Sequence, residues 1–306
     1  MKAVLLESGS PETCQPVCCA RPLSACLVGT ATLRAAQEER VAAAGLALAA
    51  GASRGALRLW LAGDAWLSPA LLQYLGQSDS PCVVRDADGA ALAWVGGTAQ
   101  PPETAAPLPP DGSSYRIRYP WDLLRIHEEL LGALTADHIV GDVSPAAHVE
   151  GRLWLGRGSR VLPGVYVEGN VVIGADCKIG PNAYLRGCTT IGNGCHIGQA
   201  VEVKNSIVMD GCSLGHLSYC GDSIVGENAN FGAGTITANF RHDGRNHRST
   251  VGEALLDTGR RKLGAIIGDD VHTGIHTSIY PGRKLWPHTW TRPGAVVQRD
   301  LTESDG

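Results

Sequence analysis

The sequence has few aromatic residues, little net charge and no long hydrophobic run. Only 5% of the 306 residues are aromatic, and the formal net charge is −4. A chain without a strong basic excess offers no field that favours nucleic acid or an anionic membrane as its main partner. No segment approaches the roughly 18 apolar residues of a membrane span, and the first residues lack the basic and apolar regions of a signal peptide. We therefore expect a cytoplasmic protein without nucleic-acid or membrane partners.

Cysteine is present but not in the paired CxxC clusters of a zinc site. Ten cysteines are spread over the chain, and the dense group comprises Cys14, Cys18, Cys19 and Cys26 at uneven spacing. Free thiols that pack as small apolar residues are the favoured interpretation there, and a zinc site is the alternative. Cys177 and Cys195 lie eighteen residues apart, so they would stack in a coil of that period.

An aliphatic residue returns at every sixth position from Val149 to Val203. The series is Val149, Leu155, Val161, Val167, Ile173, Ile179, Leu185, Ile191, Ile197 and Val203. Neither the 3.6 period of a helix nor the alternation of a strand gives this repeat, whereas a chain coiling through short parallel strands does. Eighteen residues per turn predict a triangular prism whose corners favour Gly, Asn and Asp, because these residues tolerate positive φ. The predicted fold of residues 137–301 is a parallel β-helix.

The repeat is interrupted in its second half. The phase slips by one after Val203 to resume at Val208, and slips again to Val225. Residues 237–265, rich in Arg, His and Asp, do not follow the repeat, which returns at Ile267. Long excursions from a regular scaffold are often functional, so we expect a loop thrown out from the coil there.

The first 105 residues predict a separate small α/β domain. The pattern indicates helices over residues 32–50 and 68–75, a strand over 57–61 and a hairpin over 82–95. Residues 106–136 are predicted to be a linker and a helix that begins near Pro120, a residue tolerated in a first helical turn.

Several motifs resemble one enzyme family. They are GHLSY at residues 215–219, GAGTITAN at 232–239, GRRKLGAIIG at 259–268 and YPWDLL at 119–124. Together these resemble the acetyltransferase half of bifunctional N-acetylglucosamine-1-phosphate uridyltransferase and glucosamine-1-phosphate N-acetyltransferase, in its archaeal branch, over about residues 119–301. The resemblance implies a left-handed β-helix, a homotrimer with sites between subunits, acetyl-coenzyme A as co-substrate and an amino-sugar phosphate as acceptor.

The catalytic candidates follow from this resemblance and from the chemistry. An amine that attacks a thioester must lose a proton, so a base with a pKa near the working pH has to lie within hydrogen-bond reach. By resemblance His216 is that general base, and Glu202 orients and polarises its ring. A structural role is the alternative for His216.

The acceptor's phosphate needs cationic partners. Arg186 and Lys204 match the family's phosphate contacts, and their eighteen-residue spacing places them on one face in adjacent coils. Tyr219 and Asn230 match its sugar contacts. Arg245 and Arg248 stand where the family has loop lysines, which puts the acceptor's identity in question because arginine changes the geometry.

Four residues resemble the family's acetyl-coenzyme A contacts: Ala233, Asn239, Ile275 and Arg292. Where the bacterial enzymes have Asn-Tyr-Asp-Gly, this chain has Phe240 after Asn239. His242 and His247 suggest the zinc site of the related β-helical carbonic anhydrases. That site needs histidines from adjacent coils, so no metal is predicted.

The first domain resembles a shortened sugar-phosphate nucleotidyltransferase that has lost its phosphate-binding loop. Residues 7–12 read ESGSPE, acidic and without the Gly-x-Gly-Thr-Arg pattern, and Asp64 is at most a relic of a metal ligand. We expect no nucleotidyl transfer and a role in assembly or regulation. The leading hypothesis is therefore an acetyl-coenzyme A-dependent N-acetyltransferase acting on glucosamine 1-phosphate or a related amino-sugar phosphate. The alternatives are a catalytically degenerate β-helix scaffold and an intact bifunctional enzyme.

Overall fold

The computed structural model describes residues 1–49, 56–105 and 107–303. The chain forms two compact units. Unit 1 comprises Met1–Pro11, Pro22–Cys26 and Ala31–Arg118, and unit 2 comprises Glu12–Arg21, Leu27–Thr30 and Tyr119–Gly306. Two short segments of the first thirty residues therefore belong with the C-terminal unit, which the sequence did not predict.

Unit 1 is built on a mixed six-stranded sheet with the order β4-β1-β5-β8-β7-β9. The strands are β1 (Lys2–Leu5), β4 (Ala47–Leu48), β5 (Arg58–Leu61), β7 (Cys82–Arg85), β8 (Ala91–Gly96) and β9 (Pro107–Leu108). A second pair joins β6 (Ala65–Trp66) to β10 (Tyr115–Arg116), and β3 (Ala31–Thr32) and the 3-10 turn η2 (Leu23–Ala25) complete the unit. The predicted strand and hairpin are confirmed as β5, β7 and β8.

Two helices accompany this sheet, and each begins at a hydroxyl cap. The Thr32 side chain accepts a hydrogen bond from the backbone N of Ala35 before α1 (Leu33–Ala43), and Ser68 does the same for α2 (Pro69–Gly76). Such caps satisfy N–H groups that have no partner within the helix. The helix predicted over residues 32–50 ends earlier than expected, at Ala43, because the chain turns into β4; residue 50 lies outside the described residues.

The structure divides the chain later than the predicted boundary at residue 105. Strand β9 pairs with β7, and β10 pairs with β6, so residues expected in a linker belong to unit 1 through Arg118. The Pro-rich and Gly-rich composition there concealed two very short strands.

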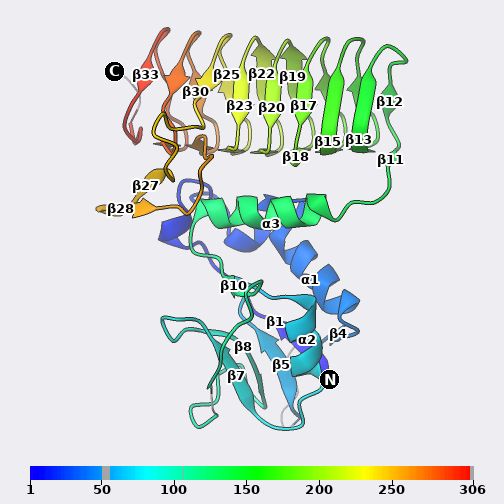
Figure 1. The fold of residues 1–306 in the computed structure, drawn as a ribbon, viewed down its shortest axis with the longest axis vertical. Coiled ribbons are helices and arrows are strands. Elements are labelled where there is room, and N and C mark those ends of the chain that lie inside the picture. Colours follow the sequence, from blue (N-terminus) through cyan, green and yellow to red (C-terminus); the bar gives the residue numbers. More distant parts are fainter. Residues whose placement is uncertain (50–55, 106, 304–306) are drawn as a thin grey trace. The chain divides into compact units, whose positions relative to one another are not determined.

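Unit 2 is a parallel β-helix with three faces, and Figure 1 shows it from the side, with its successive turns in a row. Face 1 consists of β12 (Asp142–Val143), β14 (Arg160–Val161), β16 (Lys178–Ile179), β19 (His196–Gln199), β22 (Ser213–His216), β25 (Asn230–Phe231) and β30 (His272–Thr273). Face 2 consists of β17 (Tyr184–Arg186), β20 (Glu202–Lys204), β23 (Tyr219–Gly221), β26 (Ile236–Thr237), β31 (Ser278–Ile279) and β33 (Val296–Val297). Face 3 consists of β18 (Thr189–Ile191), β21 (Ile207–Val208), β24 (Ile224–Val225), β29 (Ile266–Ile267) and β32 (Lys284–Leu285). The coil begins with β11 (His138–Ile139), and the long strands β13 (His148–Leu155) and β15 (Tyr166–Ile173) join faces 2 and 3.

The strand registers confirm the period and its interruptions. Tyr166 pairs with Tyr184 and Tyr184 with Glu202, both eighteen residues apart. The next two turns are seventeen residues long, as in the Glu202–Tyr219 and Tyr219–Ile236 pairs, which accounts for the two phase slips.

Each corner of the prism is a column of residues with positive φ. The column between faces 1 and 2, called corner B, contains Gly164, Asn182, Ala200, Leu217, Gly234, His276 and Gly294. Glycine and asparagine adopt this conformation at little cost, whereas the branched Leu217, at φ +50°, does not. The predicted Gly, Asn and Asp corners are therefore confirmed, with Ala, Leu and His as exceptions.

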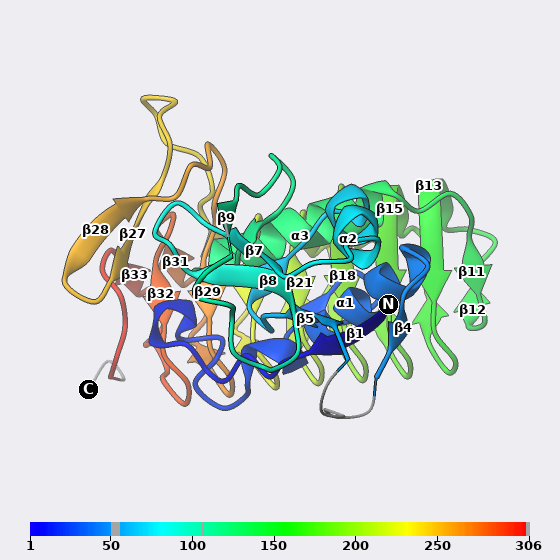
Figure 2. The same ribbon diagram turned by 90° about the horizontal axis from the view of Figure 1, so that it is seen from below.

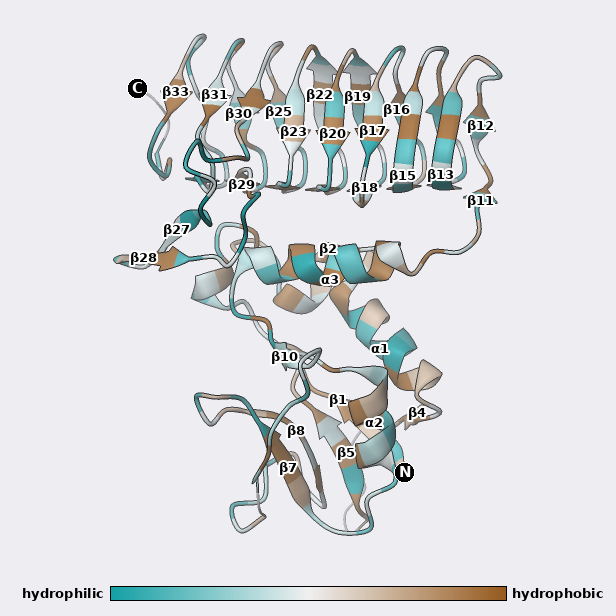
Figure 3. Ribbon diagram, viewed as in Figure 1, coloured by the Kyte–Doolittle hydropathy of each residue, from teal (hydrophilic) through white to brown (hydrophobic). Residues whose placement is uncertain are grey.

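The core lies inside the prism, where one aliphatic side chain per face points inward. Leu185, Val203 and Cys220 on face 2 are fully buried. Figure 3 shows the resulting hydrophobic bands across successive strands. Each buried Val, Leu or Ile contributes about 1.5–3 kcal/mol. Cys177 and Cys195 stack as predicted, with the Cys195 backbone N donating to Cys177 Sγ at 3.4 Å.

Face 3 is covered, whereas faces 1 and 2 have exposed positions. All residues of β18, β21, β24, β29 and β32 are buried on both sides of the strand. The cover is helix α3 (Pro120–Gly132) together with β2 (Leu27–Val28), the 3-10 turn η1 (Glu12–Cys14) and the segments around them (Figure 1). On α3 the buried His127 bridges Gly29 N, at 3.1 Å from Nδ1, and Cys188 O, at 3.0 Å from Nε2.

The predicted excursion is a hairpin that leaves the β-helix after face 2. Ile224 pairs with Ile266, forty-two residues later, so this turn holds 24 residues more than an eighteen-residue turn. Strands β27 (Arg248–Val251) and β28 (Ala254–Asp257) form the hairpin, and Figure 2 shows it projecting beside β31 and β33. The expected start at 237 is slightly early, because Thr237 still belongs to β26. Within the described ranges, no helix is long and apolar enough to cross a membrane.

Candidate functional site

The candidate base His216 lies at the end of β22, directly before corner B, and is exposed. Backbone hydrogen bonds connect it to neighbouring turns: Leu217 N donates to Gln199 O at 3.0 Å, and Gly234 N donates to His216 O at 3.1 Å. The same ladder continues as His276 N donates to Ala233 O at 2.7 Å. Gln199, His216, Ala233 and Ile275 each stand directly before a positive-φ residue of corner B. We call these four residues the corner B column.

Three of the four residues expected to bind the cofactor lie in or beside this column. Ala233 follows His216 by one turn and Ile275, 50% exposed, by two. Gly294 N donates to Ile275 O at 2.7 Å, so the turn that contains Gly294 follows Ile275. The exposed Arg292 lies in that turn, two residues before Gly294. Neighbouring strands are about 4.8 Å apart, so the column extends about 10 Å from His216 to Ile275. Asn239 is not part of it.

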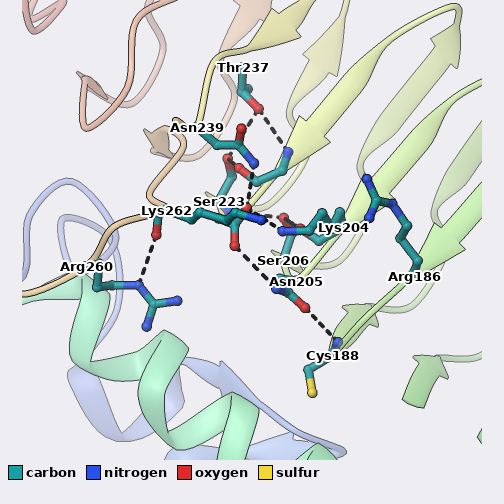
Figure 4. A network of polar contacts seen from close by, with 12 residues as sticks. Arg186, Cys188, Lys204, Asn205, Ser206, Ser223, Thr237, Asn239, Arg260 and Lys262 are labelled. Carbon is teal, nitrogen blue, oxygen red and sulfur yellow. Dashed lines mark hydrogen bonds and ion pairs between the residues drawn. The ribbon is translucent and has the colours of Figure 1, made fainter. Parts of the chain in front are cut away.

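A second column on face 2 holds the expected phosphate contacts. The register pairs Arg186 with Lys204 and Lys204 with Gly221, which confirms that the two cations occupy equivalent positions in adjacent turns. Figure 4 shows Lys204 beside Asn239, with Arg186 one strand away. Leu185 and Val203, which directly precede the two cations in their strands, point into the core. Because successive side chains of a strand point to opposite faces, both cations project outward from the prism.

Each of these cations already has a carboxylate partner. Arg186 Nε donates to Glu202 Oε1 at 2.7 Å, and Lys204 Nζ donates to Asp222 Oδ2 at 2.9 Å. Glu202, expected to orient His216, is therefore bonded to Arg186 in this structure. The residue opposite His216 in the register is Gln199.

Asp222 is a central residue of the site that the sequence reasoning did not assign. Its side chain is 2% exposed, and it accepts hydrogen bonds from Lys204, from Asn205 Nδ2 at 3.3 Å and from Asn239 Nδ2 at 2.5 Å. The signal was present in the sequence, since Asp222 lies at the second phase slip, three residues after the end of GHLSY. Its positive φ of 51° places it at a corner, from which it reaches neighbouring turns.

Asn239 belongs with the face 2 residues. Its Nδ2 also donates to Tyr219 Oη at 2.8 Å, so a predicted cofactor contact and a predicted sugar contact touch each other. Burial, reinforced by the Asp222 and Glu202 carboxylates, raises the pKa of Tyr219 to about 12, and its hydroxyl therefore stays protonated at neutral pH.

The remaining expected contacts lie elsewhere in the unit. Asn230 is exposed on face 1, paired in register with Ser213 and His272. Arg245 and Arg248 lie in the excursion and line a groove with Tyr280. The structure thus groups Lys204 with Tyr219 and Asn239, and leaves Asn230 and the loop arginines outside that group.

The histidines of the excursion are engaged differently from metal ligands. His247 is buried, its Nε2 lies 2.8 Å from Asn239 O, and burial lowers its pKa, while His242 is exposed. Among residues 1–49, 56–105 and 107–303, no three His, Cys, Asp or Glu side chains converge as a metal site would require. In unit 1, Asp64 Oδ2 accepts a hydrogen bond from Arg116 Nε at 2.7 Å.

The six-residue repeat and the parallel β-helix define a hexapeptide-repeat protein. Residues 164–289 match the family described as the GMPPB C-terminal domain. The chain is 41% identical over 185 residues to the bifunctional sugar-1-phosphate nucleotidylyltransferase/acetyltransferase of Sulfurisphaera tokodaii, covering 60% of this chain and 46% of the relative. It is 46% identical over 189 residues to the bifunctional protein GlmU of Methanococcus maripaludis, covering 61% and 45%.

The resemblance inferred from the motifs is therefore confirmed for the larger part of this chain, and the chain spans about half the length of these curated relatives. A solved structure, the polysialic acid O-acetyltransferase OatWY, aligns at 16% identity and a TM-score of 0.27, covering 56% of this chain and 82% of that one.

Proposed function

We propose that unit 2 is an acetyl-coenzyme A-dependent N-acetyltransferase acting on glucosamine 1-phosphate or a related amino-sugar phosphate. His216 is its general base. The observation that carries this proposal is the corner B column, because it aligns the candidate base with Ala233 and Ile275 on successive turns. An extended pantetheine chain along that column would bring its thioester to His216.

The chemistry assigned to these residues is a single acyl transfer. The acceptor nitrogen attacks the thioester carbonyl carbon, its bond to carbon forms and the carbon–sulfur bond breaks. His216 takes the proton that the nitrogen loses, and coenzyme A leaves. A positioned base of this kind contributes about 10² to 10⁴ in rate.

A catalytically inactive β-helix scaffold is the second candidate. The paired state of Arg186 and Lys204 favours it, because a phosphate has to compete with the Glu202 and Asp222 carboxylates for these cations. The exposed Phe240, which replaces a tyrosine of the bacterial motif, points the same way.

Release of coenzyme A on mixing the protein with acetyl-coenzyme A and a panel of amino-sugar phosphates and nucleotide-linked amino sugars separates the two candidates. We expect turnover with at least one acceptor and a loss of about 10² or more in kcat for His216→Ala. His148→Ala is the matched control, because His148 is also exposed but lies on β13, at the opposite end of the coil. Absence of turnover with every acceptor, or full activity in His216→Ala, would contradict the proposal.

The names of the curated relatives keep nucleotidyl transfer as a third hypothesis. We infer that unit 1 lacks it, because residues 7–12 are acidic and Asp64 is held by Arg116. UTP-dependent or GTP-dependent release of pyrophosphate in the presence of a sugar 1-phosphate would overturn this inference.

A further inference from the structure

The excursion and the last turns of face 2 enclose a groove of about 930 Å³. Its floor continues the Arg186–Lys204 column, since the registers lead from Lys204 through Gly221 and on toward Ala238, Tyr280 and Gln298. Its wall is the hairpin side, with Phe240, Arg241, Arg245 and Arg248, and Leu255 beyond them. The groove lies wholly within unit 2.

The positive charge in this groove exceeds the negative charge. Arg241, Arg245, Arg248 and Arg283 line it against a single aspartate, Asp243, in a chain whose net charge is −4. Asp243 is bonded to Arg241, at 2.8 Å from Nε. Asp300 lies 3.8 Å from Arg283. Within the described part of the chain, the guanidinium groups of Arg245 and Arg248 form no salt bridge, in contrast to the paired Arg186 and Lys204.

The wall is fixed to the β-helix at Gly282. Arg283 Nη2 donates to Arg248 O at 3.2 Å, and Ser249 Oγ donates to Gly282 O at 2.9 Å. A Cβ at Gly282 would lie 2.7 Å from Arg248 O, so the hairpin approaches this corner too closely for any other residue. On the other side, Arg260 forms an ion pair with Glu128 of α3. These contacts fix the hairpin backbone at Arg248 against the β-helix before a ligand arrives.

The remaining lining fits a heterocyclic ring. Phe240 is 49% exposed and Tyr280 48%, and both present aromatic surface to the groove. Aromatic faces stack on nucleobases without requiring a particular base. One arginine guanidinium group can donate two parallel hydrogen bonds to phosphate oxygens. Several such groups therefore suit a diphosphate better than a single phosphate.

We propose that this groove binds the nucleoside diphosphate group of the acceptor, so that the acceptor is a nucleotide-linked amino sugar. This inference rests on the proposed function, because the ligand is an acceptor only if unit 2 is a transferase. The uncompensated charge lies at Arg245 and Arg248, whereas the cations of the Arg186–Lys204 column are neutralised within the chain. The acceptor's phosphates are therefore bound in the groove, and its amino sugar extends along face 2.

Calorimetric titration of the full chain with UDP and with GDP tests the proposal, because it measures binding without turnover. We expect at least one of them to bind, and the double variant Arg245→Ala/Arg248→Ala to weaken it by about ten- to a hundredfold, as the loss of charge-assisted hydrogen bonds does. Arg152→Ala is the control, since Arg152 is exposed but lies on β13. Coenzyme A is titrated into the same variants, because its nucleotide moiety has the same chemistry.

The outcomes separate the ligand sources and the two proposals. Weakened UDP or GDP binding with unchanged coenzyme A affinity supports the acceptor assignment. Weakened coenzyme A binding alone would assign the groove to the co-substrate and overturn the acceptor assignment. A wild-type chain that binds neither UDP nor GDP would also overturn the acceptor assignment. A chain that binds the nucleotide through the arginines but releases no coenzyme A with any acceptor retains the groove as a nucleotide site, while the transferase proposal fails.

Discussion

Asp222 organises the candidate site at the scale of single residues. It joins Lys204, Asn205 and Asn239, which come from the preceding turn and from the start of the excursion. A buried carboxylate of this kind holds a buried ammonium in place, and the pair stabilises the fold only while both partners remain. The side chain is therefore both a structural requirement for face 2 and a competitor for any phosphate that approaches Lys204.

Removing Asp222 alone should be costly. Asp222→Ala leaves the Lys204 ammonium, 8% exposed as a residue, without its partner, so we expect a loss of about 3–5 kcal/mol in the free energy of unfolding. The double variant Lys204→Met/Asp222→Ala should recover most of that loss, because no buried charge remains. Urea unfolding of the wild type, both single variants and the double variant measures the coupling; equal losses in Asp222→Ala and the double variant would contradict it.

His127 should make the stability of the protein depend on pH. Burial lowers its pKa to about 4 from an ordinary value near 6.5. Between these two pH values the unfolded chain binds a proton that the folded chain does not, so stability rises with pH across this window. Its contribution is complete above pH 6.5 and falls by about 3 kcal/mol as the pH drops to 4.

The measurement is the difference between the wild type and His127→Gln in denaturant unfolding at pH 7 and pH 4.5, which removes the titration of carboxyl groups common to both. Glutamine can accept from Gly29 N and donate to Cys188 O, but it does not titrate. The variant should lose stability less steeply toward acid. Parallel pH profiles of the two proteins would show that His127 does not titrate with a depressed pKa.

At the scale of elements, the corners decide how regular the coil is. Leu217 connects face 1 to face 2 directly after His216, at φ +50° and with 63% of its surface exposed. Its side chain buries little, yet its left-handed backbone costs a leucine about 1–2 kcal/mol. The sequence thus keeps a strained residue beside the candidate base.

Leu217→Asn should relieve this strain. Asparagine tolerates the left-handed region, so we expect a gain of about 0.5–1 kcal/mol, whereas the β-branched Leu217→Val should be less stable than the wild type. Thermal unfolding of the three proteins gives the order. A melting temperature of Leu217→Asn below that of the wild type would mean that contacts of the leucine outweigh the backbone cost.

The same elements show how far the sequence reaches. The six-residue period predicted the three faces, and the slips after Val203 and Cys220 predicted the seventeen-residue turns, because one inward side chain per face is a local rule. The role of Asp222 could not be predicted, since it depends on side chains that meet across turns. Nor could the covering of face 3, because Gly29 meets His127 and Thr190 only after residues far apart in sequence have packed.

At the scale of the whole molecule, the predicted site lies on one side of the β-helix. Helix α3 and the segments Glu12–Arg21 and Leu27–Thr30 cover face 3. The candidate residues lie on faces 1 and 2, at corner B and in the excursion that follows face 2. His216 and Ile275 are exposed along a convex edge of the prism. Ligand sites are concave and bury most of their ligand, so this edge provides only one wall.

A second copy of the chain can supply the other wall, and the family resemblance implies that three copies do so. We therefore expect light scattering coupled to size-exclusion chromatography to give three times the chain's 32.1 kDa. Because the site is then shared between copies, dilution below the concentration at which trimers dissociate should lower the specific activity in parallel with the trimer fraction. A monomer that retains full activity would require a complete site on one convex edge, and the assignment of the corner B column to the cofactor would then be wrong.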